Sequence, residues 1–218
     1  AILAVFGVAL WLAAACYVRW GRGGRRHGEQ PRLRTMLALG VHPGLLRIAA
    51  LFTLAVGAGF GVYMMLPLFL VAERGMDRAA ANGLIALSRG LTLPVIFAAG
   101  WLADRLGQRR ALVAFQAATG ALTAGMALAT PPLGAALTVI LHAGASVCFF
   151  PACYPLIAAL VPAAQRTLAV SLVSLCGTLL GAGLTPALLG AIAERWSFAA
   201  ALLLLGLLTL ASPLLLRK

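Results

Sequence analysis

The chain has 218 residues, of which 62% are hydrophobic and only 10% charged, with a mean hydropathy of +1.01. An average soluble domain is about 45–50% apolar and about 25% charged. This composition therefore excludes a soluble enzyme, a disordered chain and a secreted disulfide scaffold. The 17 basic and 5 acidic residues give a net charge of +12. The bases lie in short gaps between apolar runs, which indicates membrane orientation, so no nucleic-acid partner is expected.

Seven apolar runs follow one another along the chain, and about 20 residues suffice to cross about 30 Å of hydrocarbon. The runs cover residues 1–18, 46–71, 82–103, 111–129, 133–161, 167–193 and 197–216. The first begins without Met, and basic residues follow it, whereas a signal peptide has them in front. We therefore expect residue 1 to lie inside or beside a membrane helix of a longer chain. The pattern predicts an all-α integral membrane protein with seven transmembrane segments.

Basic residues are distributed unevenly between alternate gaps. Thirteen of the 17 Lys and Arg residues lie in one set of gaps, and the other four are Arg74, Arg78, Arg89 and Arg195. The positive-inside rule places the richer set, and with it the C-terminus, in the cytoplasm. The sequence therefore predicts a transmembrane helix at 1–18, a basic cytoplasmic linker at 19–45 and a six-helix unit at 46–218.

Polar residues at membrane depth are concentrated in the second, third, fifth and sixth runs. Arg89 lies about 10 Å into the third run and His142 about 14 Å into the fifth, at 1.5 Å per residue. Tyr63 lies in the outer half of the second run. A charge near the membrane centre costs at least about 2.5–3.5 kcal/mol, so ionisable residues there are functional candidates. We expect these three residues to share one layer that lines a cavity.

Each of these three residues also has a purely structural interpretation. Arg89 could extend to the outer surface or pair with Glu73 or Asp77. His142 could be a neutral, hydrogen-bonded packing residue, and Tyr63 an aromatic filler. Further cavity candidates are Ser146, on the same helical face as His142, and Ser174 and Thr178 in the sixth run.

Small residues form a stripe along the sixth run. Ser174, Gly177, Gly181 and Thr185 recur at spacings of three and four, which leaves one helical face almost bare. Such stripes let helices pack closely in lipid, so Gly177 and Gly181 are predicted to be packing positions. The four cysteines lie in apolar runs without CxxC spacing, and we interpret them as small buried hydrophobic residues. No metal site is expected.

The loop between the third and fourth runs reads Gly-Trp-Leu-Ala-Asp-Arg-Leu-Gly-Gln-Arg-Arg from Gly100 to Arg110. It resembles the signature loop of the major facilitator superfamily, in which Gly, Asp, Arg, Gly and further basic residues link two helices in the cytoplasm. The matching positions are Gly100, Asp104, Arg105, Gly107, Arg109 and Arg110. The sequence departs from the pattern at Gln108, where the family usually has a basic residue. Asp104 is expected beside a helix N-terminus or paired with an arginine.

The resemblance implies a fold and a mechanism. The family has two six-helix halves, and residues 46–218 correspond to the C-terminal half, after the end of the sixth helix at 1–18. The substrate lies between the halves, which rock to expose it alternately, and the signature loop acts in this switch. The implied partners are a small-molecule substrate, the lipid bilayer and an N-terminal half. The resemblance implies no enzyme activity and no cofactor, and it places the chain in a plasma membrane, expected to be a bacterial inner membrane.

The sequence leaves the substrate class open. Arg89 has no acidic residue at its own depth, which favours an organic or inorganic anion that would neutralise it. Proton-coupled drug efflux is the alternative and would require an acidic residue from the other half. Two further alternatives are a seven-helix receptor and a membrane subunit that does not itself transport. The only lysine is Lys218, so a retinal Schiff base within the last helix is excluded.

Overall fold

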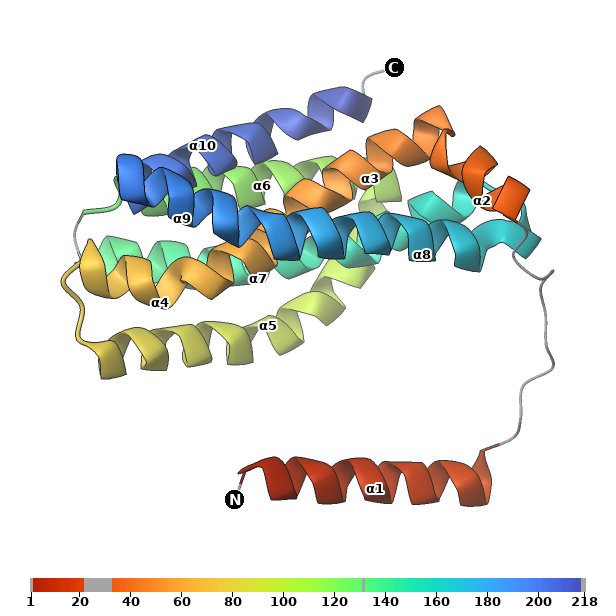
Figure 1. Cartoon of the computed structure of the whole chain (residues 1–218), viewed down its shortest axis with the longest axis horizontal. Helices are drawn as coiled ribbons and strands as arrows, with labels where there is room; N and C mark the ends of the chain where they lie inside the picture. Colours follow the sequence, from red (N-terminus) through yellow and green to blue (C-terminus); the bar gives the residue numbers. More distant parts are fainter. Residues whose placement is uncertain (1, 22–32, 131, 217–218) are drawn as a thin grey trace.

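The computed structural model describes residues 2–21, 33–130 and 132–216, and within these ranges the ordered elements are all helical. The α-helices are α1 (Ile2–Trp20), α2 (Leu33–Gly40), α3 (Pro43–Val56), α4 (Val62–Ala72), α5 (Arg78–Leu106), α6 (Gln108–Leu128), α7 (Pro132–Ala159), α8 (Arg166–Cys176), α9 (Thr185–Arg195) and α10 (Phe198–Ala211). The π-helices η1 (Gly57–Gly61) and η3 (Gly177–Leu184) join α3 to α4 and α8 to α9, and the 3₁₀ turns η2 (Ala163–Gln165) and η4 (Ser212–Leu216) flank the last two spans. Figure 1 shows a bundle of long helices, with α1 standing apart from it.

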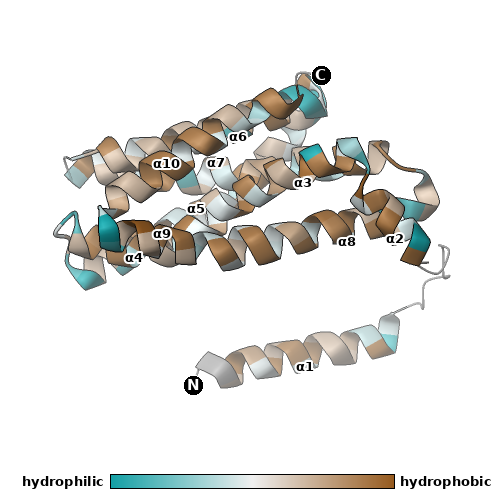
Figure 2. Cartoon of the chain, turned by 45° about the horizontal axis from the view of Figure 1, so that its top comes forward, coloured by the Kyte–Doolittle hydropathy of each residue, from teal (hydrophilic) through white to brown (hydrophobic). Residues whose placement is uncertain are grey.

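Six helical spans are long and apolar enough to cross a membrane. Numbered after the seven apolar runs, they are the second to seventh spans: Pro43–Ala72 (second), Arg78–Leu106 (third), Gln108–Leu128 (fourth), Pro132–Ala159 (fifth), Ala163–Arg195 (sixth) and Phe198–Leu216 (seventh). Ala4–Trp20, in the first run, is a shorter apolar helix. Apolar side chains such as Phe97 and Leu133 are exposed on the outside, and Figure 2 shows hydrophobic colour on the outer faces of the bundle. The prediction of an all-α membrane protein is confirmed.

The second span begins earlier than the apolar run predicts. The Nδ1 atom of His42 accepts a hydrogen bond from the Leu45 N–H at 3.3 Å, and Pro43 occupies the first helical turn. A capping acceptor followed by proline is a strong helix start, so α3 begins at Pro43. The predicted linker also contains helix, because α1 continues to Trp20 and α2 occupies Leu33–Gly40. Residues 22–32 of the linker lie outside the described residues.

Two adjacent residues after α4 tie three spans together at one end of the bundle. Glu73 accepts hydrogen bonds from the backbone N–H groups of Phe198 and Ala199, at the start of α10. Arg74 donates from Nη2 to the Met126 and Ala127 carbonyls, at 2.9 and 2.8 Å, at the end of α6. Each charge thus lies at the helix end whose dipole it complements.

Small residues set the distance between α6 and α10. A Cβ atom at Gly120 would lie 2.3 Å from the Leu210 backbone nitrogen, and one at Gly206 would lie 2.5 Å from that of Ala124. The two backbones therefore approach each other as closely as glycine permits. α10, which is apolar apart from Thr209, packs against the bundle through this contact.

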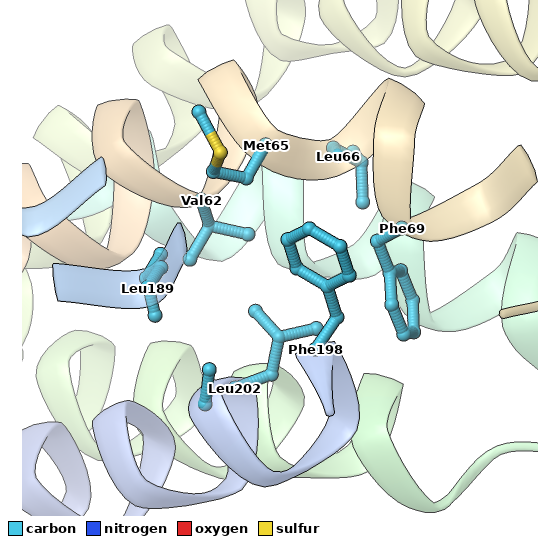
Figure 3. Close-up of a pocket in the computed structure, with 8 residues that line it drawn as sticks. Val62, Met65, Leu66, Phe69, Leu189, Phe198 and Leu202 are labelled. Atoms are coloured by element: carbon cyan, nitrogen blue, oxygen red, sulfur yellow. The ribbon is translucent and has the colours of Figure 1, made fainter. Parts of the chain in front are cut away.

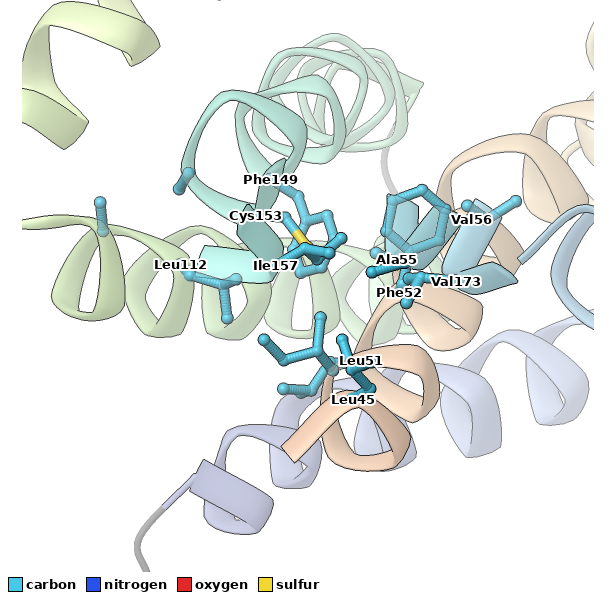
Figure 4. Packing of buried hydrophobic residues seen from close by; sticks show 14 of the residues in the cluster. Leu45, Leu51, Phe52, Ala55, Val56, Leu112, Phe149, Cys153, Ile157 and Val173 are labelled. Carbon is cyan, nitrogen blue, oxygen red and sulfur yellow. The ribbon is translucent and has the colours of Figure 1, made fainter. Parts of the chain in front are cut away.

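Two apolar clusters fill the bundle, one toward each end. In the first, Phe149, Cys153 and Ile157 of α7 lie between Leu112 of α6 and Phe52 of α3 (Figure 4). The second contains residues of α4, α5, α9 and α10, among them Phe69 and Leu202. Cys148 and Cys153 are buried and Cys176 is half-buried. Cys16 is exposed on α1, so the expectation of a buried thiol is wrong at that position, since α1 stands apart from the bundle.

Candidate functional site

The level between the two apolar clusters contains both π-helical segments. In the second span the first cluster ends at Val56 and the second begins at Val62, which brackets η1. In the sixth span, Val173 belongs to the first cluster and Leu189 to the second, with η3 between them. π-Helical turns within α-helices often occur at functional sites. A functional site is therefore expected in the middle of the bundle.

The two π-helical segments cross each other in direct contact. A Cβ atom at Gly61 would lie 3.3 Å from the Gly181 carbonyl oxygen, and one at Gly181 would lie 3.0 Å from the Gly57 backbone nitrogen. A Cβ atom at Gly177 would strike the Phe52 ring at 2.4 Å. Gly177 and Gly181 therefore lie where the sixth span packs closely against the second. This crossing holds η1, and the backbone groups it carries, in a fixed position.

Arg89 lies near the middle of α5, eleven residues and about 16 Å from its start. Its guanidinium carbon lies 4.0 Å from the centre of the Tyr63 ring, and its Nη2 donates to the Gly59 carbonyl at 3.4 Å. The side chain is half-buried. Glu73 bonds to α10 and Asp77 caps α5 through the Ala79 and Ala80 N–H groups. Pairing of Arg89 with either acid is therefore ruled out in this structure.

His142 lies on α7 opposite Arg89. Its side chain is only 4% exposed, and its Nε2 atom is buried without a hydrogen-bond partner among the described residues. The ring lies beside Ala58 of η1 and close to Arg89. A buried polar atom without a partner is costly, which indicates a role beyond packing.

Arg89, His142 and Tyr63 line one small cavity. Its volume is about 10 Å³, near the minimum that holds one water molecule, and Ser88 and Gly59 contribute to its wall. The predicted juxtaposition of the three residues is thus found in the structure. Ser88, whose hydroxyl donates to the Ile85 carbonyl at 2.8 Å, was not anticipated. The sequence gives no signal for Ser88 other than its position next to Arg89.

The remaining cavity candidates are only partly brought together. Ser146 is buried one turn from His142, close to Gly59, and its hydroxyl donates to the Ala143 carbonyl at 3.0 Å. Ser174 is half-buried and Thr178 is exposed. Neither of these two lines the Arg89 cavity. They lie on the sixth span, which is among the least buried of the six.

A second pocket lies between α4, α9 and α10, and it is entirely apolar. Figure 3 shows Phe198 and Leu202 of α10 facing Val62, Leu66 and Phe69 of α4. It has no polar surface and no room for a water molecule. It is a packing feature of the second cluster, and the polar chemistry lies at Arg89 and His142.

The loop between α5 and α6 is a tight turn whose polar groups bond locally. Gly107 has φ of 84°, a conformation that favours glycine. The Asp104 carboxylate accepts from Nε2 of Gln108 at 3.0 Å, so the residue that departs from the signature is its partner, and no described arginine pairs with it. Arg105 stacks on Trp101 with its guanidinium carbon 4.0 Å from the ring centre. Gly100 faces open space.

The same loop is fastened to the end of the last span. Arg109 donates from Nη2 to the carbonyl of Leu216 in η4. Arginine at a helix C-terminus complements the exposed carbonyls there. The start of α6 and the end of the last span are therefore linked at the face of the bundle opposite Glu73 and Arg74.

Comparison with known families bears on the whole bundle. A family model described as Major Facilitator Superfamily matches residues 48–218, which includes all but the first few residues of the six spans. A comparison with curated proteins finds no match. The match covers well over half of the chain and agrees with the six apolar spans and the loop at 100–110. The chain belongs to the major facilitator superfamily, and it is a membrane-embedded secondary transporter of small solutes and not an enzyme.

Proposed function

We propose that the transported solute is a small anion and that Arg89 binds it. The proposal rests on the observation that the Arg89 guanidinium makes few contacts. It has five N–H donors, yet in the described structure it makes one long hydrogen bond and one contact with an aromatic face. A carboxylate, nitrate or phosphate would satisfy two donors at once, because the planar fork of arginine matches two oxygens.

The distribution of acidic residues supports an anion. Glu73, Asp77, Asp104 and Glu194 all lie at the ends of spans. Within the described spans, the layer of Arg89 and His142 therefore has positive charge without a carboxylate to balance it. A lipophilic cation would be repelled there, so drug efflux would require an acid from the facing half. The anion proposal requires no such residue.

We infer that residues 46–218 form the C-terminal half of the transporter and that 1–18 ends the N-terminal half. The second, third, fifth and sixth spans then face the substrate path. Two of them, Arg78–Leu106 and Ala163–Arg195, are the least buried in the bundle, as expected for helices that the other half would cover. The loop of Gly100, Asp104, Arg105, Gly107, Arg109 and Arg110 would act in the conformational switch, because it joins α5 to α6 and reaches the last span.

The distribution of basic residues supports an orientation with the linker and the α5–α6 loop in the cytoplasm. In a background without the four native cysteines, single cysteines at Gly23 and Gln108 should react with a membrane-impermeant maleimide only from the cytoplasmic side. A cysteine at Asp77 should react only from outside. Labelling of the Asp77 position from the cytoplasm would reverse the orientation.

The anion proposal is tested by ligand-dependent stability. The full-length transporter in detergent is heated with nitrate, phosphate, benzoate, glucose or tetraphenylphosphonium at constant ionic strength. A ligand that binds only the folded state at 100 times its Kd stabilises it by about 2.7 kcal/mol. We expect an anion to raise the melting temperature and the cation to have no effect. Stabilisation by tetraphenylphosphonium alone would favour cation efflux and contradict the proposal.

A further inference from the structure

We propose that an anionic phospholipid binds where the second span begins, with its phosphate group in a cavity between α2 and η2. The inference does not depend on which solute is transported, because this cavity lies at the end of the bundle and shares no residue with the cavity at Arg89. It rests on the size and the donor groups of the cavity, on the apolar face of α2 and on the position of α2 beside the second span.

The cavity is an open space of about 350 Å³ beside α2. It is lined by residues of α2, the α2–α3 turn and η2, namely Arg34, Thr35, Ala38, Leu39, His42 and Gln165. Pockets that hold small ligands have volumes of about 300–1,000 Å³. The cavity is therefore large enough for the phosphodiester group of a lipid, whereas the cavity of about 10 Å³ at Arg89 is not.

The polar side chains that line the cavity can all donate hydrogen bonds. Arg34 is exposed and makes no hydrogen bond to another described residue, so its N–H donors are available. The Nδ1 atom of His42 accepts from the Leu45 N–H, so the neutral ring carries its proton on Nε2 and can donate there. Thr35 adds a hydroxyl and Gln165 an amide. Arginine binds two phosphate oxygens at once, so this set of donors favours a phosphate group.

The charges around the cavity favour an anionic headgroup over a zwitterionic one. No carboxylate lines the cavity. Among the described acidic residues, Glu73, Asp77 and Glu194 lie at the other end of the bundle, and Asp104 accepts a hydrogen bond from Gln108. The choline group of phosphatidylcholine would find no described carboxylate here, whereas phosphatidylglycerol has no cationic group to balance. Basic pockets at the membrane edge are typical binding sites of anionic headgroups.

α2 also has an apolar face that the described bundle does not cover. Leu33, Leu37 and Val41 recur every four residues, with exposed fractions of 72%, 63% and 72%. The Val41 N–H donates to the Leu37 carbonyl at 3.2 Å, so the helical turn continues to Val41. Leu39 is buried in the first apolar cluster, and Arg34, seven residues before Val41, lies at the edge of the exposed face. An apolar face bordered by arginine is typical of a helix in the membrane interface.

The position of α2 brings this face to the membrane surface. Only two residues, Val41 and His42, separate α2 from α3, and α2 contacts both α3 and α8. Figure 1 shows α2 at one end of the bundle, beside the start of α3. Since α3 opens the second span, α2 lies at the level where that span leaves the hydrocarbon. An acyl chain can therefore follow the apolar face while the phosphate group occupies the cavity, and the bound lipid would hold α2 at the membrane surface.

The first experiment measures lipid binding to the full-length transporter in detergent by native mass spectrometry. The probes are dioleoyl-phosphatidylglycerol, dioleoyl-phosphatidylcholine and soluble glycerol phosphate. Phosphatidylglycerol should bind most tightly, and Arg34→Ala should weaken its binding about tenfold, because a charge-assisted contact with the phosphate is lost. The control is Arg110→Ala, which removes an exposed arginine at the start of α6 that does not line the cavity. It should bind phosphatidylglycerol as the wild type does.

Three results of this experiment would overturn the inference. The first is equal affinity of the wild type and Arg34→Ala for phosphatidylglycerol. The second is an equal loss in Arg34→Ala and Arg110→Ala, which would indicate a general effect of charge. The third is binding of glycerol phosphate as tight as that of phosphatidylglycerol, which would make the cavity a site for a soluble phosphate compound.

The second experiment locates the apolar face of α2 relative to the bilayer. In a background without the four native cysteines, Leu37→Cys is labelled with bimane and the full-length transporter is reconstituted in vesicles that contain phosphatidylglycerol. A spin-labelled lipid should quench the bimane fluorescence, and aqueous iodide should not. Quenching by iodide alone would show that the face lies in water. Protection from both quenchers would show that protein covers it, and either result would contradict the inference.

Discussion

Replacing Gly120 by alanine is expected to destabilise the bundle strongly. The added Cβ atom would lie 2.3 Å from the Leu210 nitrogen and 2.8 Å from the Gly206 carbonyl oxygen. Both are backbone atoms, so the contact can be relieved only by separating α6 from α10. Overpacking costs about 1–3 kcal/mol and occasionally more, and a backbone clash lies at the upper end. About 3 kcal/mol corresponds to a decrease of about 6–12 °C in melting temperature for 150–250 residues, and to a smaller decrease for a longer chain.

The matched control is Gly190→Ala in α9. A Cβ atom there meets no atom within 4 Å, and alanine is favoured over glycine in a helix by up to about 1 kcal/mol. Its melting temperature should equal or slightly exceed that of the wild type. Equal melting temperatures for Gly120→Ala and Gly190→Ala, measured on the full-length transporter in the same detergent, would show that the close helix contact is wrong.

The spans could be predicted from the sequence because the membrane imposes a simple rule. A span needs about 20 apolar residues, and few other segments of a chain satisfy that length. The predicted 82–103 and 133–161 lie within or near the observed 78–106 and 132–159. The predicted ends of the spans were less accurate where a capping side chain determines the residue at which a helix begins. Asp77 and His42 cap helices that begin several residues before the apolar runs.

The layer of Arg89, His142 and Tyr63 could also be predicted, because their depths follow from helix length alone. Their partners could not. The Gly59 carbonyl belongs to a π-helical segment, which the apolar pattern of the sequence does not distinguish from an α-helix. The bond between Asp104 and Gln108 was missed for a different reason. An amide side chain at 108 is a weaker sequence signal than a basic one, although it lies one turn from the carboxylate to which it donates.

Substitution of Arg89 is expected to have the largest effect on substrate affinity. Hydrogen bonds to charged groups contribute about 1.5–3 kcal/mol each. Loss of a two-bond contact in Arg89→Ala should therefore cost about 3 kcal/mol, which is about a hundredfold increase in Kd. Arg89→Lys retains the charge but loses the fork, and we expect a loss of about tenfold. Arg78→Ala, an exposed arginine at the start of the same helix, serves as the control.

The most direct measurement is the Kd of the full-length transporter and these three variants for whichever of nitrate, phosphate and benzoate stabilises the wild type most. If Arg89 binds the anion, Kd should increase in the order wild type, Arg89→Lys, Arg89→Ala. The Kd of Arg78→Ala should equal that of the wild type. An unaltered Kd in Arg89→Ala would contradict the account, because Arg89 would then be a structural residue held by Tyr63 and Gly59.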